Sequence, residues 1–306
     1  MDISIVGNRY IETPMGSLPL DLLRPIVEHL AGDFRSLLAI SLVSHELRME
    51  GQRILFRKVV LSFCGDRHVK FLTAITSSSL LAPLVKEYHL FDLVYKVEPF
   101  WGLTRRGLQA MVNLKILRFC TLRGEKVSAE ILHACTFQLE VFQWNNRDHD
   151  DTEQVSAFLQ TQPHLRILSV FWHGPDLGIS GICPRLQVLH GDQYTINAFL
   201  PGRRITSLKW TPNEEELLLN DPVDHLSEEF HYIRFFSFGG LRGRSRLDLV
   251  IPHLRAVEVL EIGLESLAGP VCLNHLHLRR MYTFLINHTG TSIILRNPQV
   301  TNPHPL

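Results

Sequence analysis

The chain has no excess of charge of either sign, no long apolar run and no paired cysteines, and each absence excludes a class of protein. Its 306 residues include 31 Lys and Arg against 31 Asp and Glu, so the broad positive field of a nucleic-acid-binding protein is not expected. No stretch approaches the ~18 consecutive apolar residues of a membrane-spanning helix. The first twenty residues carry charged side chains where a signal peptide needs a continuous apolar segment. We therefore expect a protein of the cytosol or nucleus that binds neither nucleic acid nor membrane.

The five cysteines are too few and too scattered for a disulfide framework or a zinc site. They are odd in number and widely spaced, and no two of them form a C-x-x-C pair. They are Cys64, Cys120, Cys135, Cys183 and Cys272. We interpret them as buried apolar thiols.

Short catalytic motifs are also missing. The sequence contains no dinucleotide-binding or phosphate-binding glycine pattern, no serine-hydrolase elbow and no His-Glu-x-x-His pair. His275 and His277 are two residues apart, but no carboxylate or cysteine clusters with them in the sequence. We therefore expect no catalytic residues, no cofactor and no metal. An enzyme with a dispersed site is kept as a weak alternative, because a catalytic triad can be scattered along a chain.

Residues 18–57 predict three short helices. Asp21 is the expected N-cap of the first helix and Gly32 its stop, Asp33 caps the second, and Ser44 opens the third. Helices this short bury little surface among themselves, and their apolar positions lie on more than one face. Some of these side chains must therefore meet another surface, either in this chain or in another protein.

This segment resembles an F-box over roughly residues 17–57. The resemblance is carried by the following residues: Leu18-Pro19, Leu22, Leu23, Ile26, Leu30, Leu37-Leu38 and Leu42-Val43-Ser44. It implies docking on the Skp adaptor of a cullin-RING ubiquitin ligase. The positions that match the family's adaptor contacts are Leu18, Pro19, Leu22, Leu23, Ile26, Leu37, Val43 and Leu47, the last where the family often has Trp.

The rest of the chain repeats a pattern of apolar, two others, apolar, one other, apolar. The middle apolar position recurs about ten times, at Val59, Tyr88, Leu117, Phe142, Leu168, Leu189, Leu208, Phe236, Leu260 and Leu276. The mean interval of about 24 residues lies in the range of leucine-rich repeats, although the intervals are uneven. The pattern predicts an α/β fold, a small three-helix F-box-like unit followed by an irregular leucine-rich-repeat-like solenoid with a parallel sheet.

The connections and the ends of this array can also be predicted. Helical stretches are expected at 66–79, at 151–160 with a capping-box-like start, and from Asp221 onward. A strand near 293–295 should close the array. The expected organisation is a tail at 1–16, a helical module at 17–57, a repeat region at 58–298 and a tail at 299–306.

One face of the predicted sheet is the expected target-binding surface. Strand side chains alternate, so a mostly polar row shares the face opposite the repeated apolar positions. From this face we select Arg118, Gln143, Ser169, His190, Lys209, Phe235, Glu261 and His277. A neighbouring apolar row on the same face is either a contact for a partner or internal packing; it includes Ile116, Val141, Ile167, Val188, Phe235 and Val259. An arginine cluster within 239–246 is a further candidate contact for an acidic partner, or else a solvated insertion.

These features predict a non-enzymatic adaptor that docks on a Skp-type adaptor, and through it on a cullin ligase, while its repeats hold an unidentified protein substrate. The alternative is an interaction scaffold unconnected with ubiquitin, whose helical module packs only on its own chain. Exposure of Leu22, Ile26 and Val43 is expected for the adaptor, and burial of the same side chains for the scaffold.

Overall fold

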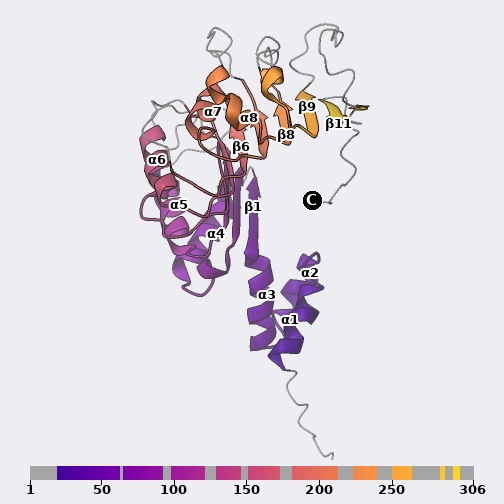
Figure 1. Cartoon of the computed structure of the whole chain (residues 1–306). Helices are drawn as coiled ribbons and strands as arrows, with labels where there is room; N and C mark the ends of the chain where they lie inside the picture. Colours follow the sequence, from indigo (N-terminus) through magenta and orange to yellow (C-terminus); the bar gives the residue numbers. More distant parts are fainter. Residues whose placement is uncertain are drawn as a thin grey trace, which may run out of the picture. The chain divides into compact units, whose positions relative to one another are not determined.

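The computed structural model shows an α/β protein that divides into two compact units, Met1–Arg57 and Lys58–Leu306 (Figure 1). It describes residues 19–62, 65–91, 98–120, 129–145, 151–172, 181–212, 223–239, 250–263, 283–286 and 292–296. Several predicted features lie outside these residues: Leu18, His277, the tenth predicted repeat, both tails and most of the arginine cluster. No helix in the described part is long and apolar enough to cross a membrane.

The helical unit contains the three predicted helices, α1 (Leu20–Glu28), α2 (Phe34–Ile40) and α3 (His45–Arg57). Asp33 caps α2 as predicted, because its carboxylate accepts hydrogen bonds from the backbone N–H groups of Arg35 and Ser36 at 3.0 and 3.2 Å. Ser44 precedes α3, and its Oγ accepts a hydrogen bond from the Leu47 N–H at 3.2 Å.

Two predicted ends of α1 are wrong. The helix begins at Leu20 with Pro19 at the N-cap, so Asp21 lies in the first turn, where its charge favours the helix dipole without capping it. The helix ends at Glu28 and not at Gly32. The residues after it form turns, in which the N–H groups of Leu30 and Ala31 donate hydrogen bonds to the carbonyls of Val27 and Glu28.

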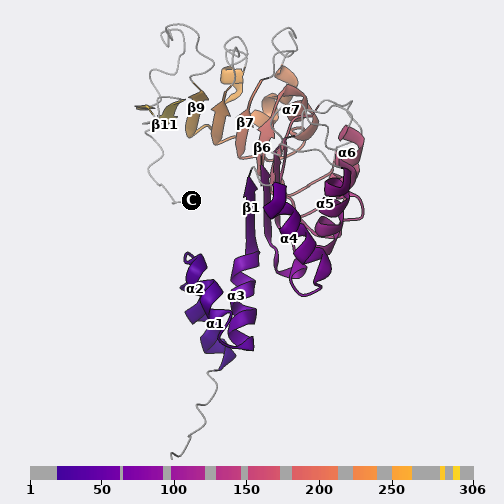
Figure 2. The same cartoon turned by 180° about the vertical axis from the view of Figure 1, so that it is seen from behind.

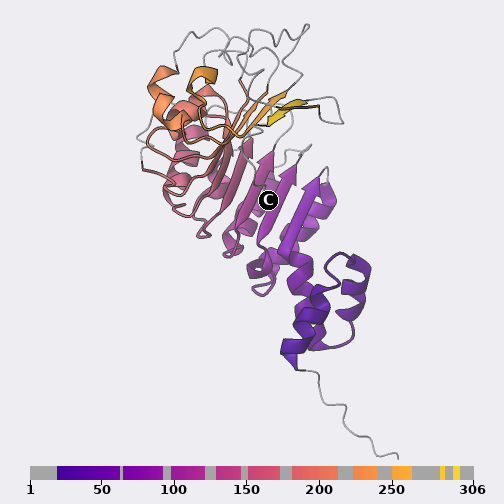
Figure 3. The same ribbon diagram turned by 45° about the vertical axis from the view of Figure 1, so that its right-hand side comes forward.

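The sheet unit is built on one eleven-stranded sheet. Its strands are β1 (Lys58–Ser62), β2 (Glu87–Phe91), β3 (Ile116–Cys120), β4 (Val141–Asn145), β5 (Ile167–Val170), β6 (Val188–Gly191), β7 (Ser207–Trp210), β8 (Phe235–Phe238), β9 (Val259–Gly263), β10 (Thr283–Ile286) and β11 (Ser292–Arg296). Strands β1 to β9 are parallel and follow chain order (Figure 3). The strand predicted near 293–295 is present as β11, but it runs antiparallel to β9, and β10 lies beyond it. The prediction that this strand closes the array is therefore wrong.

The helices of this unit lie along one face of the sheet, as Figures 1 and 2 show for α4, α5 and α6. Their bounds are α4 (Gly65–Ser77), α5 (Glu98–Ala110), α6 (Thr152–Gln160), α7 (Gln193–Phe199) and α8 (Ser227–Phe230), with 3-10 turns η1 (Ala82–Leu84), η2 (Ala129–Leu132), η5 (Asp224–Leu226) and η6 (Ile251–His253). The predicted helices at 66–79 and 151–160 are confirmed, whereas α5 and α7 were not predicted. Asp151 makes no capping bond to α6; its carboxylate instead accepts a hydrogen bond from the Ala129 N–H at 3.0 Å.

The repeated apolar positions form the core between this sheet and its helices. Their middle members pair directly across the parallel strands from Tyr88 through Leu117 and Phe142 to Leu260, and all of these are at most 1% exposed. Aromatic rings fill the space between strands, with Phe119 stacked on Trp144 at 4.4 Å between centroids. Each repeat thus covers the apolar face of the next.

Gly191 interrupts this apolar pattern for a steric reason. A β-carbon there would collide with the Val170 carbonyl oxygen and with the Thr195 side chain at the start of α7. Thr195 itself is fully buried, and its hydroxyl accepts a hydrogen bond from the Trp172 N–H at 2.9 Å. The repeat therefore has glycine where its neighbours have large apolar residues.

Buried polar side chains connect consecutive repeats on the helix side. The Gln162 amide accepts a hydrogen bond from the Leu139 N–H at 2.8 Å and donates one to the Phe137 carbonyl at 3.3 Å. Arg203 reaches the Ile182 carbonyl in the same way, at 2.9 Å. These bonds satisfy backbone groups that the sheet leaves unpaired.

Candidate protein-binding surfaces

Seven large apolar side chains of the helical unit are exposed. We call this set the helical-unit patch; it consists of Leu22, Ile26, Phe34, Leu38, Leu42, Val43 and Met49, which are 36 to 82% exposed. Among the described residues, only five other large apolar side chains are exposed to this degree, although the sheet unit is several times longer. Such a concentration of apolar surface on a small unit is typical of an interaction site.

The predicted adaptor contacts fall into three groups. Leu22, Ile26 and Val43 are exposed, Pro19 is also exposed at the N-cap of α1, and Leu23 and Leu47 are half-buried. The exposure of the first three is the result expected for an adaptor.

Leu37 is the exception, because it is only 2% exposed and belongs to the core of the helical unit. It lies where α2 approaches α3, since a β-carbon on Gly51 would collide with Ser41 and lie 3.2 Å from the Leu37 carbonyl oxygen. We therefore remove Leu37 from the predicted contact surface.

Phe34 and Met49 are patch residues that the sequence analysis missed. Phe34 lies one helical turn from Leu38, as Leu22 does from Ile26, so each pair shares one face of its helix. This spacing was visible in the sequence, but it could not reveal which face of each helix is covered.

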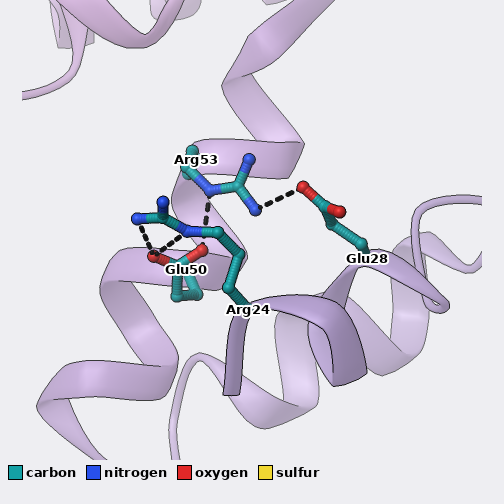
Figure 4. Close-up of polar contacts among 4 residues, drawn as sticks. All are labelled: Arg24, Glu28, Glu50 and Arg53. Atoms are coloured by element: carbon teal, nitrogen blue, oxygen red, sulfur yellow. Dashed lines mark hydrogen bonds and ion pairs between the residues drawn. The ribbon is translucent and has the colours of Figure 1, made fainter. Parts of the chain in front are cut away.

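An ion network around the buried side chain of Glu50 links α1 and α3 (Figure 4). The Glu50 carboxylate is 5% exposed and accepts hydrogen bonds from Arg24 at 3.2 Å and from Arg53 at 2.6 Å. Arg53 also pairs with Glu28 at 3.0 Å. Burial raises the pKa of Glu50, but the hydrogen bonds from the two arginines outweigh burial, and the pKa is lowered overall. Glu50 therefore stays ionised.

The sheet unit presents a second candidate surface, on the sheet face opposite its helices, which we call the open face. Seven of the predicted target-binding residues lie there, in register from Arg118 to Glu261, with Phe235 in the adjacent row. Lys209 is exposed, while Arg118, Gln143, His190, Phe235 and Glu261 are half-buried. Ser169 is 7% exposed and is corrected to a buried residue.

Ser169 belongs to a chain of polar side chains on the open face. Its Oγ lies 2.9 Å from His190 Nδ1, and His190 Nε2 lies 3.1 Å from Thr211 Oγ1. Burial lowers the pKa of His190 to about 4, with a further contribution from the charge of Lys209. The imidazole is therefore neutral at physiological pH and links its neighbours instead of carrying a positive charge.

At the first strands, the open face carries a cluster around His89, which is 7% exposed. Its Nε2 lies 3.8 Å from Glu87 Oε2, and Lys58 Nζ lies 3.3 Å from the same oxygen. Burial lowers the pKa of His89, and the positive charges of Arg118 and Lys58 lower it further. The charged atoms offered to a partner here belong to Lys58, Glu87 and Arg118.

The apolar row runs beside this polar row, through Ile116, Val141, Ile167, Val188, Phe235 and Val259. All six side chains are half-buried, and Ser207 interrupts the row between Val188 and Phe235. Each side chain of the row therefore exposes only part of its apolar surface to solvent.

The described residues contain no group of three or more His, Cys, Asp or Glu side chains placed to hold a metal ion. No protein-family model matches the chain, and comparison with curated protein sequences finds no similar protein.

Proposed function

We propose that this protein is a substrate-recognition adaptor of a cullin-RING ubiquitin ligase. The helical unit acts as an F-box that docks on a Skp-type adaptor, and the sheet unit acts as an irregular leucine-rich-repeat-like array that binds a target protein. The observation that carries the proposal is the exposed helical-unit patch, which combines the F-box sequence pattern with uncovered apolar surface at Leu22, Ile26 and Val43.

The arrangement of the sheet unit supports the second part of the proposal. Parallel strands follow one another with the same apolar position in register, at intervals from 19 residues (Leu189 to Leu208) to 29 residues (Val59 to Tyr88). In the described part of this unit the helices lie along one face, and we assign the other face to the partner. In a leucine-rich-repeat array this face is the concave one, and here it offers Arg118, Lys209 and Phe235.

The protein itself carries out no bond chemistry in this proposal. It holds a target near the conjugating enzyme of the ligase and so raises the effective concentration of the target's lysines. Affinity for the Skp-type adaptor comes from burial of the helical-unit patch, at about 25 cal/mol for each Å² of apolar surface removed from water.

Co-expression of the full chain with a Skp-type adaptor, followed by affinity capture, tests the docking step. Ile26→Asp and Val43→Asp place charges in the patch and should abolish capture. The matched control is Val112→Asp, because Val112 is 47% exposed in the sheet unit, much like Ile26 at 53%. If a folded wild-type chain captures no adaptor, the ligase proposal is overturned and a repeat scaffold with another partner is favoured.

A further inference from the structure

A cavity of about 560 Å³ lies on the helix side of the sheet unit, between α5, η2 and α6. This volume falls within the range of pockets that hold small organic molecules. Its apolar lining includes Leu132, Ala134, Ala157 and Phe158. Ala134 and Ala157 are exposed, so the cavity is accessible from solvent. None of its lining residues belongs to the helical-unit patch or to the open face, and neither proposed binding step uses it.

Arg105 is the cation of this cavity. Its guanidinium lies 3.0 Å from His133 Nδ1, and a guanidinium only donates, so this nitrogen is placed to accept the hydrogen bond. The His133 carbonyl accepts a hydrogen bond from Gln109 at 3.0 Å, which fixes the position of the turn. Among the residues that the structure describes, Arg105 forms no ion pair with a carboxylate.

Besides His133, the lining holds two further titratable side chains, Cys135 and Glu130. Burial raises the pKa of the Cys135 thiol to about 12 against the opposing charge of Arg105, so the thiol is uncharged. Glu130 is the one acidic residue of the lining; it is exposed, and it forms no ion pair with Arg105. The half-buried guanidinium therefore determines which charge a bound molecule should carry.

We propose that this cavity binds a small apolar molecule bearing one carboxylate. The apolar body packs against Leu132, Ala157 and Phe158, and the carboxylate pairs with Arg105. A planar guanidinium matches a carboxylate through two parallel hydrogen bonds, and partial burial strengthens such a pair relative to the same pair in water. The chain would then carry a ligand site in addition to its two protein-binding surfaces.

Ligand-observed NMR titration of the full chain tests this assignment, with 4-phenylbutyrate and decanoate as probes and 4-phenylbutan-1-ol as the neutral counterpart. Both carboxylates should bind saturably, and the alcohol should bind at least about tenfold more weakly, because a hydrogen bond to a charged group contributes about one to two powers of ten in affinity. The absence of saturable binding by both acids, or equal binding by the alcohol, overturns the proposal.

Two pairs of variants locate the binding. Arg105→Met should weaken binding about tenfold or more, whereas Arg106→Met, the exposed neighbour outside the lining, should leave it unchanged. Ala157→Trp should block the cavity, whereas Ala74→Trp, at an exposed site on α4, should not. Gln154→Trp is a second blocking variant should Ala157→Trp lose its helical circular dichroism. If the probe still binds both blocking variants, it binds outside this cavity and the assignment is contradicted. Adaptor capture is a separate measurement, so its outcome does not decide whether the cavity binds a ligand.

Discussion

The two units of the molecule differ in how completely they bury their apolar side chains. The helical unit has three helices of 9, 7 and 13 residues, and Val27 and Leu37 are the only large apolar residues among its described side chains that are almost fully buried. In the sheet unit, large side chains from Tyr88 to Ile262 are buried repeat after repeat. A small helical unit lacks the volume for a closed core, whereas each repeat of an array is covered by its neighbours. The helical unit therefore leaves apolar surface exposed, which is the surface that the proposed docking step would bury.

The largest effect should come from overpacking the sheet unit at Gly191. Gly191→Ala places a β-carbon against the Val170 carbonyl oxygen, a backbone atom that cannot rotate away. We expect a loss of about 3 kcal/mol in the free energy of unfolding, measured by urea denaturation of the full chain. Gly239→Ala is the control, because a β-carbon there meets nothing within 4 Å. Equal stability of the two variants would show that the array is packed more loosely than described.

A second pair of variants compares buried and exposed leucines within α2. Leu37→Ala should cost about 2–3 kcal/mol, because it leaves a cavity in the small core, while Leu38→Ala at a 46% exposed site should change stability by less than about 0.5 kcal/mol. Hydrogen exchange of the α1 to α3 amides in the full chain measures both. In the adaptor-capture assay the order of the two variants should reverse. Among chains that remain folded, Leu38→Ala should weaken capture more than Leu37→Ala does, because Leu38 belongs to the helical-unit patch and Leu37 to the core. Equal costs in stability would contradict the assignment of Leu37 to the core.

The ion network predicts that the helical unit loses stability at acidic pH. Because the pKa of Glu50 is lowered from its ordinary value of 4.5, its stabilising contribution is present above that pH and is lost as the pH falls below it. Glu50→Gln should cost about 1–2 kcal/mol at neutral pH, since Arg24 and Arg53 are partly exposed and retain solvent. Amide exchange of α1 and α3 should then depend less on pH in the variant. An unchanged pH profile would show that Glu50 is not the titrating group.

The smallest effect is expected at the turn beside the cavity. Ala134 has a φ of 60°, in the left-handed region where a β-carbon is unfavourable. Ala134→Gly should relieve this strain and raise the free energy of unfolding by about 0.5–1 kcal/mol, measured by urea denaturation. Ala74→Gly, at an exposed site inside helix α4, should instead lower it by a similar amount. A loss of stability at both positions would contradict the strain argument.

Much of the fold could be predicted because its signals are local. The caps at Asp33 and Ser44 depend on side chains that bond the backbone two or three residues away. The strands could be placed because one apolar pattern recurs in each, and the open-face row followed from the alternation of strand side chains. Helix α5 was missed because its sequence contains Pro99, Gly102 and Gly107, which are poor helix formers, and α7 because its seven residues are too few to show a helical periodicity.

By itself, the sequence determined the three helices, the alternation of buried and open strand residues, and the α/β class, since these depend on spacing along the chain. Tertiary structure alone decided that Leu37 is buried while Leu38 is not, that Glu50 meets Arg24 across 26 positions, and that the final strands turn antiparallel. It also decided that α5, η2 and α6 line a cavity that is open to solvent and includes Arg105 in its wall. These features depend on distances between residues far apart in the chain, which local spacing does not encode.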